Sequence, residues 1–469
     1  MLAQGRWQGV LDWIALLHEA GIKDDCWLMY WRANARMALA PEDARAMFEA
    51  SYAAAGEARD ALCELLAVAG IVQTYMLMYT HFRPLDRWIG VLLEGLGKSP
   101  VFPSADAELS VQAALLVALS YRNPGHPAMA GCVERVFALL DQVTDLNLRT
   151  TGAAHLLAYG CTTGPVRVGL RALPILEELL NRPETSAPTI AWCSYIISWF
   201  QCVRGDLDAS LRAVERIKHL AEEQGLAYAL KFAGFMGAWA SLYRHELSEV
   251  DRWLALAKHT MDPNHSYDMA TYHGTLAWRL TLGGELQAAL DHFAICLPLY
   301  DEAGSLMHRI NYRAVLMIHA LVAAGRFAEA RERIREATAI GKAGLTGYQI
   351  FSIALAEANM SMNENDADEE RIAIVHALEV AKRNFEDGAP CVHAQRPWVA
   401  RLFARALELG IEVDFVGRVI RTFHLPAPSP DTDPWPWPIR VCALGELIVE
   451  LDGAPLEFGR KVPRKPLAL

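Results

Sequence analysis

Apolar residues recur at helical spacing through most of this chain, and one short phrase introduces them repeatedly. Four segments begin at a turn and continue with apolar residues three or four positions apart: RGDLDASLRAVERI, RHELSEVDRWLALA, GGELQAALDHFAIC and GRFAEARERIREA. Their first apolar residues are Leu207, Leu247, Leu286 and Phe327, at offsets of 40, 39 and 41 residues. This spacing places the apolar side chains on one face of an α-helix. The pattern predicts amphipathic helices repeated at a fixed period.

The period continues on both sides of these four segments. Val166 stands another 41 residues upstream, and weaker matches begin at Pro127, Leu85, Asp43 and, downstream, Asp368. Pairs of helices at a fixed period stack into an α-solenoid, in which each unit buries the apolar face of its neighbour. We therefore expect an all-α solenoid of helical-hairpin repeats of about 40 residues over residues 1–423.

The repeated phrase resembles the second helix of a tetratricopeptide repeat. It has Gly at the turn in three of the four segments and a small residue such as Ala289 or Ala330 soon after it. The spacing is longer than the period of about 34 residues in that family. HEAT-type units share the longer period and are the alternative, but the Gly-x-Leu or Gly-x-Phe phrase favours a tetratricopeptide-like solenoid.

Aromatic residues stand at equivalent positions of successive repeats. In the tetratricopeptide-like register, the first helix of each pair lines the concave surface. One column there holds Trp199, Trp239, Trp278 and His319, and a second holds Trp192, Phe232, Thr271 and Tyr312; Tyr195 and Phe235 complete the candidate set. These side chains could grip a ligand by stacking or anchor a peptide. Alternatively, and preferred here, they pack one repeat on the next, because aromatic residues bury large areas.

The last 46 residues have a different pattern. Residues 424–438 hold six prolines in fifteen positions, which predicts a stiff, extended linker. The segments IRVCALGE, LIVELDG and APLEF then read as three short antiparallel strands, and Asp452-Gly453 is a hairpin signal between the last two. The final stretch carries Arg460, Lys461, Arg464 and Lys465 without an acid, and Pro466 suits the first turn of a helix.

This tail resembles the N-terminal sheet and first-helix entrance of an OmpR-type winged-helix domain, as in SARP-like bacterial transcriptional activators. The resemblance makes residues 439–469 the incomplete start of a DNA-binding domain whose reading helix would follow residue 469. The four basic residues would then contact phosphates only. Alternatively, they are a solvated loop.

The repeat region resembles the arm of MalT-type regulators of the STAND family. LAQGRWQGVLDWI is similar to the opening of that arm, and FEDGAPCVHAQRPWVARLFARALELGIEVDFVGRVI is similar to its closing phrase. The resemblance implies the signal-receiving and coupling arm of a transcriptional activator, which binds a small ligand or a partner protein. The alternative is a freestanding tetratricopeptide-like scaffold for protein–protein interaction, and self-association is compatible with either.

The resemblance implies that ATP would bind a missing N-terminal module, so no cofactor is expected in this chain. The string Gly97-Lys98-Ser99 lacks the P-loop glycine five residues before Gly97, where Leu92 stands. No common catalytic motif is present, so no enzymatic activity is expected. His259, Asp262, His265 and Asp268 are the best metal candidate, but a polar inter-repeat turn explains them, and no metal site is expected.

Charge and composition restrict the partners and the compartment. A net charge of -11 argues against a surface that wraps nucleic acid. Nine cysteines without a CxxC pair suit reduced thiols. Neither a signal peptide nor an apolar run of about 18 residues is evident, so a cytoplasmic protein is expected.

Overall fold

The computed structural model describes residues 7–37, 40–305, 308, 315–340, 345–364, 366–388, 395–442, 448–451 and 453–456. The helices are α1 (Trp7–Glu19), α2 (Cys26–Met37), α3 (Pro41–Ala58), α4 (Ala61–Met78), α5 (Leu85–Gly97), α6 (Ala105–Arg122), α7 (Ala128–Leu140), α8 (Leu146–Thr162), α9 (Val166–Leu180), α10 (Ala187–Arg204), α11 (Leu207–Gln224), α12 (Ala227–Arg244), α13 (Leu247–Thr260), α14 (Ser266–Leu282), α15 (Leu286–Ala303), α17 (Ile318–Ala323), α18 (Phe327–Ile340), α19 (Gly347–Ser361), α20 (Ala367–Glu386), α21 (Arg396–Glu408) and α22 (Val413–Phe423). The strands are β1 (Ile439–Cys442), β2 (Ile448–Leu451) and β3 (Ala454–Pro455).

The predicted α-solenoid is confirmed, and the repeat anchors are helix starts. Helices α9, α11, α13, α15 and α18 begin at Val166, Leu207, Leu247, Leu286 and Phe327. In the segment RGDLDASLRAVERI, the pair Gly205-Asp206 explains such a helix boundary. Gly205 adopts a left-handed φ of 81° that ends α10, and the Asp206 side chain accepts a hydrogen bond from the Ala209 amide, which starts α11.

The two helices of each hairpin differ in burial. Helix α10 buries eleven of its 18 residues, whereas α11 buries six of its 18. The first helices are therefore apolar on most sides and lie between neighbouring hairpins, and the second helices are amphipathic and face outward. Helix α4 is long and apolar enough to span a bilayer, contrary to the expectation from run length, but 67% of that segment is buried inside the protein, as in a core helix.

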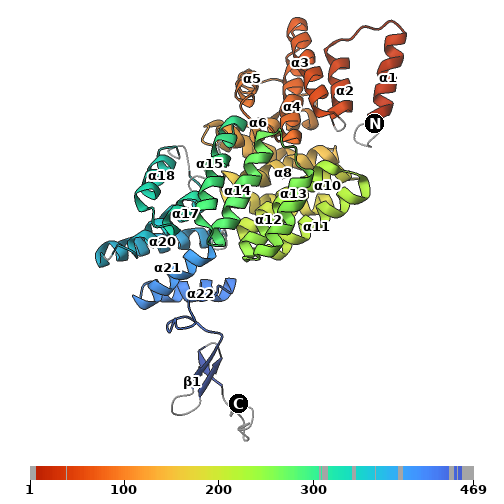
Figure 1. Ribbon diagram of the computed structural model, residues 1–469. Helices are drawn as coiled ribbons and strands as arrows, with labels where there is room; N and C mark the ends of the chain where they lie inside the picture. The colour runs from red at the N-terminus through yellow and green to blue at the C-terminus, as the bar shows by residue number, and fades with distance from the viewer. Residues whose placement is uncertain are drawn as a thin grey trace.

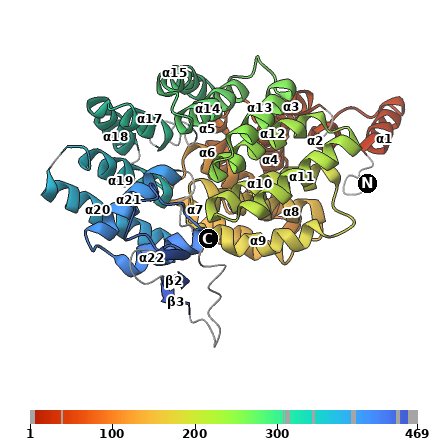
Figure 2. The same ribbon diagram turned by 60° about the horizontal axis from the view of Figure 1, so that its bottom comes forward.

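The solenoid coils so tightly that successive turns touch. Helices α5 and α6 lie beside α14 and α15 in both ribbon views (Figures 1 and 2). The segment between α4 and α5 makes this contact: the Phe82 amide donates to the Ala303 carbonyl at 2.8 Å, and the Arg83 guanidinium donates to the Asp301 carbonyl at 2.8 Å. Arg122 adds a hydrogen bond to the Gly304 carbonyl. The chain thus meets itself roughly five repeats later.

Aromatic side chains fill the centre of this closed turn. Tyr79 is 0% exposed, and its ring lies 4.9–6.2 Å from the rings of five residues on α6, α10, α12 and α14: Tyr121, Trp192, Tyr195, Phe232 and Tyr267. Its hydroxyl shares a hydrogen bond with that of Tyr121. The segment after α4 therefore acts as a plug that joins four inner helices.

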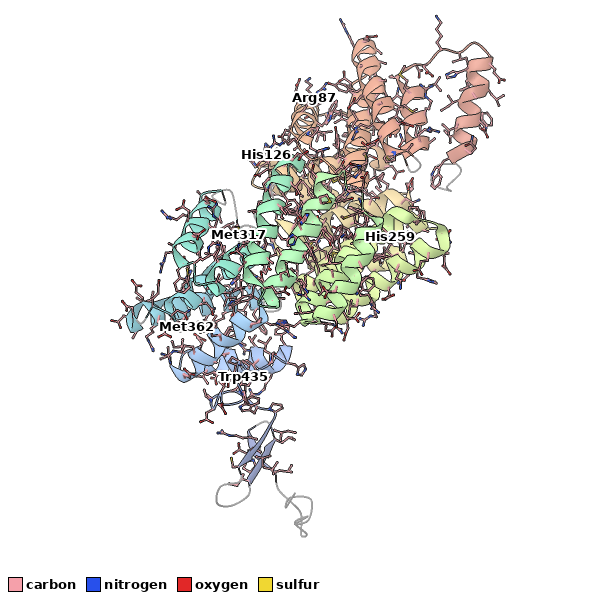
Figure 3. The ribbon with its side chains drawn as sticks, viewed as in Figure 1. Arg87, His126, His259, Met317, Met362 and Trp435 are labelled. Carbon is pink, nitrogen blue, oxygen red and sulfur yellow. The ribbon has the colours of Figure 1, made fainter. Side chains whose placement is uncertain are left out.

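A second core continues to the end of the helices. Helices α19–α22 share an apolar cluster that also buries Leu425 and Trp435. Trp435 lies under α22, between the helices and the strands (Figure 3). The proline-rich segment thus packs against the last helices at these points, and its role as a linker between domains stays a prediction.

The three predicted strands form an antiparallel sheet in the order β1-β2-β3. Ile439 pairs with Leu451, Val441 pairs with Val449, and the Leu456 amide donates to the Val449 carbonyl. Alternation of side chains puts these apolar residues on one face. Two of them, Ile439 and Val441, are 60% and 59% exposed. This apolar face of the sheet is therefore largely exposed to solvent.

Replacing Tyr79 tests the plug. We expect Tyr79→Ala to lower the free energy of unfolding by about 3–5 kcal/mol, because it leaves a cavity among four helices, and Tyr79→Phe by about 1 kcal/mol, because it removes one hydrogen bond. Urea titration followed by circular dichroism measures both. Trp13→Ala, at a side chain that is 62% exposed, is the control and should cost no more than about 0.5 kcal/mol. A Tyr79→Ala variant as stable as this control would contradict the role of the plug.

Candidate functional site

A cavity of about 200 Å³ lies between two turns of the superhelix. One wall is the turn from α8 to α9, including Thr162, Val166 and Arg167. The facing wall comes from a later turn and includes Tyr348 of α19 and the end of α20 at Asp387. Side chains of the inner helices α10, α12 and α14 lie between these walls. The cavity exists because the coil brings together segments that are far apart in sequence.

The first predicted aromatic column lines this cavity. The rings of Trp199 and Trp239 meet edge to face at a centroid distance of 5.8 Å, and those of Trp239 and Trp278 do so at 6.5 Å. All three indoles line the cavity. They pack one repeat on the next and also present aromatic surface to the cavity, so the two interpretations of this column describe the same side chains.

The indole N–H groups of the column differ in hydrogen bonding. The Trp239 Nε1 donates to Thr275 Oγ1 at 2.9 Å. Trp278 is 3% exposed, and its Nε1 has no hydrogen-bond partner among the described residues. A buried donor without an acceptor is rare, because it loses its bond to water without replacement. The Trp278 indole lines the cavity, but its Nε1 is enclosed by protein atoms and does not face the open space.

The other predicted aromatic residues lie elsewhere. Trp192, Tyr195 and Phe232 surround Tyr79 in the plugged half of the coil, and Phe235 is buried in α12. Thr271 bonds to the Tyr267 carbonyl and the Tyr300 hydroxyl. These side chains lie in the core and not on an open concave surface, because the plug fills the space inside the coil.

The last member of the first column, His319, is buried behind the cavity. Its Nε2 shares a hydrogen bond with Ser352 Oγ at 2.9 Å, and its ring lies 5.0 Å from that of Trp398. Val315 and Leu316, one turn earlier, line the cavity instead. Tyr312 and the four basic candidates, Arg460, Lys461, Arg464 and Lys465, lie outside the described residues.

Several cavity residues could not be found from the repeat pattern. Tyr348, Asn384 and Asp387 come from α19 and α20, and Arg167 comes from α9. These residues come together at the cavity because of the number of repeats in one turn of the coil. No local sequence pattern encodes that number. Only the position of Tyr348 at the start of a first helix could have drawn attention to it.

The polar groups considered for metal or nucleotide binding have structural roles. The Asp268 carboxylate accepts two hydrogen bonds of 3.0 Å from the buried Lys231 ammonium and one from the Asp262 amide. Among the described residues, no group of three or more potential metal ligands comes together. Gly97 ends helix α5, and Lys98 pairs with Glu94 at 2.8 Å, so this string ends a helix, whereas a P-loop begins one.

Cys161, the one thiol among the described residues that line the cavity, is poorly suited to nucleophilic chemistry. Burial raises the pKa of Cys161 well above its usual range, so the thiol stays protonated at neutral pH. The aromatic walls suit binding, which depends on the shape of an apolar pocket.

Comparison with known proteins assigns no family to this chain. No family model matches this chain, and no curated protein sequence matches it. A solved structure of a Rap protein complexed with competence and sporulation factor is similar over 77% of this chain and 93% of that chain, with 11% sequence identity and a TM-score of 0.49.

The buried imidazole of His319 predicts a pH dependence of stability. Burial lowers the pKa of His319 to about 3, whereas its ordinary value is 6.5. The unfolded chain therefore binds the extra proton between these values, and stability falls as the pH falls through this window. The loss reaches about 1.4 kcal/mol per pH unit for one such group.

Lowering the pH from 7 to 5 should reduce the free energy of unfolding of the wild type. We expect this reduction to be about 2 kcal/mol smaller in His319→Gln. Urea unfolding at the two pH values measures this difference. His259→Gln, at an exposed residue near the end of α13 (Figure 3), is the control and should keep the wild-type dependence. Equal pH dependence in the wild type and His319→Gln would contradict the prediction.

Proposed function

We propose that this protein is a receptor scaffold: a helical-repeat protein that takes a small ligand into the tryptophan-lined cavity and transmits its presence through the coil. The observation that carries the proposal is the position of the cavity. It lies between two turns, and its lining combines three inner-helix tryptophans with side chains from α9 and α19. Such concave, mostly apolar pockets with few polar groups are the usual form of small-molecule sites.

The packing inside the coil favours a small ligand over a long peptide. An extended peptide needs a continuous groove, as other helical-repeat scaffolds provide on their concave face. Here Tyr79 and Phe82 occupy the centre of the first turn and contact α14 through Tyr267. Among the described residues, these side chains fill the centre of the first turn, and the cavity between the turns suits a small molecule or a single side chain.

The same arrangement explains how occupancy would be transmitted. Arg167 lies on one turn and Asp387 on the next, and both line the cavity. A ligand that contacts both walls stabilises the coil in the spacing in which it binds. In a solenoid, small rotations between repeats add up over the array, so a fixed spacing at the cavity changes the position of distant helices. Partner proteins would bind the two arrangements of these helices with different affinities.

A thermal-shift screen of a metabolite library tests this function. A ligand at 100 times its Kd adds about 2.7 kcal/mol of stability, which raises the Tm by several degrees. We expect at least one compound to stabilise the wild type but not Val203→Phe, which fills the cavity beside Trp199. Trp253→Phe, on the outer helix α13, is the control and should retain the shift. Compounds that stabilise Val203→Phe equally, or none that stabilise the wild type, would contradict the proposal.

A second candidate function, the coupling arm of a transcriptional regulator, is favoured by the terminal sheet. Its strands follow in antiparallel order, and its apolar face is bare, as in a module that needs a covering helix. Together with the resemblance of the tail to a winged-helix entrance, this supports a DNA-binding module that begins at β1. The ligand-binding arm would then control that module.

Salt-dependent binding of duplex DNA tests the second candidate. If Arg460, Lys461, Arg464 and Lys465 contact phosphates, the logarithm of the binding constant should fall with the logarithm of salt concentration at a slope of about -3 to -4. Fluorescence anisotropy with a labelled duplex measures this slope. A variant with all four residues changed to Ala should lose it, and an unchanged slope would reject the assignment.

A further inference from the structure

Ion pairs between arginine and aspartate join neighbouring hairpins of the solenoid. Arg122, the last residue of the inner helix α6, donates hydrogen bonds of 2.7 and 2.6 Å to Asp86, the second residue of α5. Arg244, the last residue of α12, pairs in the same way with Asp208, the second residue of α11. Side chains at these two positions, the end of an inner helix and the first turn of the preceding outer helix, therefore lie within reach of each other.

The same two positions hold two arginines between α9 and α10. Arg167 is the second residue of α9, and Arg204 is the last residue of α10. Their sequence offset is close to that of the two ion pairs, which span 36 residues each. Among the described residues, neither arginine has an acidic partner, and Arg204 makes only a hydrogen bond of 3.5 Å to the side-chain oxygen of Gln201. Two like charges therefore stand where other repeats have an ion pair.

Both guanidinium groups are accessible and lie beside the cavity. Arg167 is exposed and lines the cavity, and Arg204 is half-buried. No nitrogen of Arg204 belongs to the enclosed polar atoms that lack a partner. Val203, the residue before Arg204, also lines the cavity. The free N–H groups of the two arginines are therefore open to a molecule that enters the cavity.

The surrounding charges favour an anion. His245 follows the end of α12, and burial and the positive charge of Arg396 lower its pKa. Burial and the charge of Arg244 likewise lower the pKa of Arg396. Asp387 is the one carboxylate among the described residues that line the cavity, and it has no ion pair with either cavity arginine. Two free guanidinium groups therefore outweigh one carboxylate at this place.

An oxyanion with an apolar body fits these surroundings. A carboxylate or phosphate group has several acceptor sites, and the guanidinium group presents a fork of N–H donors that matches them. The apolar part of the lining, including Trp199, Val203 and Leu316, suits the rest of such a molecule. The acid group and the apolar body would thus each meet matching protein groups.

We infer that Arg167 and Arg204 together bind the oxyanion, a carboxylate or a phosphate group, of a ligand whose apolar part occupies the cavity. The inference rests on the proposed function, because it specifies the ligand of the same cavity. The bound oxyanion takes the place that Asp86 and Asp208 have in other repeats. It therefore joins α9 to α10 in the way that these aspartates join their own hairpins.

Probes of similar shape separate the charge of the ligand from its apolar surface. Phenylacetate carries the oxyanion, and phenylacetamide is its neutral counterpart. We expect the full chain to bind phenylacetate at least about tenfold more tightly in a ligand-observed NMR titration, because hydrogen bonds to two charged donors distinguish the probes. Phenyl phosphate shows which oxyanion is preferred: tighter binding than phenylacetate assigns the site to phosphate esters, and weaker binding assigns it to carboxylic acids.

Replacing Arg167 by the residue of the equivalent repeats gives a matched test. Arg167→Asp should form an ion pair with Arg204, so its Tm should equal or exceed that of the wild type. The same variant should bind phenylacetate no more tightly than phenylacetamide, because the oxyanion site is then occupied by a side chain. Arg182→Met, near the other end of α9, removes an exposed arginine that pairs with Glu178 and should keep the wild-type preference.

The outcomes also separate this inference from the proposed function. Equal binding of phenylacetate and phenylacetamide to the wild type would overturn the oxyanion site, and this comparison needs no variant to fold. If no probe binds while metabolites from the screen stabilise the wild type but not Val203→Phe, the ligand class is overturned and the receptor function stands. A preference for phenylacetate that persists in Arg167→Asp would also overturn the inference.

Discussion

The segment after α4 carries Tyr79 and Phe82 into the centre of the superhelix, where they meet rings from four inner helices. Hydrogen bonds from Phe82 and Arg83 to Ala303 and Asp301 fix this segment to a much later repeat. The contact determines how closely one turn of the coil follows another. Without it, the inner helices would surround an open groove, and the faces that now meet across the coil would need other partners.

The cavity follows from this closure. In the first half of the coil, the plug occupies the central space. In the second half, the walls are the turn from α8 to α9 and helix α19, and side chains of the inner helices lie between them, including Trp199, Trp239 and Trp278. In the proposed function, the same tryptophans serve both stability and recognition. Their edge-to-face contacts join neighbouring repeats. A ligand bound to one indole would therefore also affect the repeats beside it.

The repeat pattern predicts much of this structure, because local chemistry sets helix boundaries. Gly205 and Asp206 mark a turn wherever they stand, and the register of Leu207 fixes the position of Trp199 on the facing helix. The strands from Ile439 onward were equally evident from alternation. These features depend on residues close together in sequence.

The closure could not be predicted in this way. Tyr79 stands at the end of an ordinary apolar helix, and nothing near it indicates contact with Ala303. Arg167 and Asp387 face the same cavity only because of the number of repeats in a turn, which small rotations between helices determine. The repeat pattern left open whether Trp192 and Phe232 line a concave surface or pack one repeat on the next, and their contacts with Tyr79 depend on the same closure. Long-range closure, and not local periodicity, separates core aromatic residues from cavity aromatic residues.

The indole N–H resonances of Trp199 and Trp239 test the central claim most directly. In protein labelled with ¹⁵N-tryptophan, Trp199→Phe and Trp239→Phe identify these two resonances. The account predicts that both resonances shift when a stabilising ligand is added, because both indoles line the cavity. If neither resonance moves when such a ligand saturates the protein, the claim that this cavity is the receiving site is contradicted.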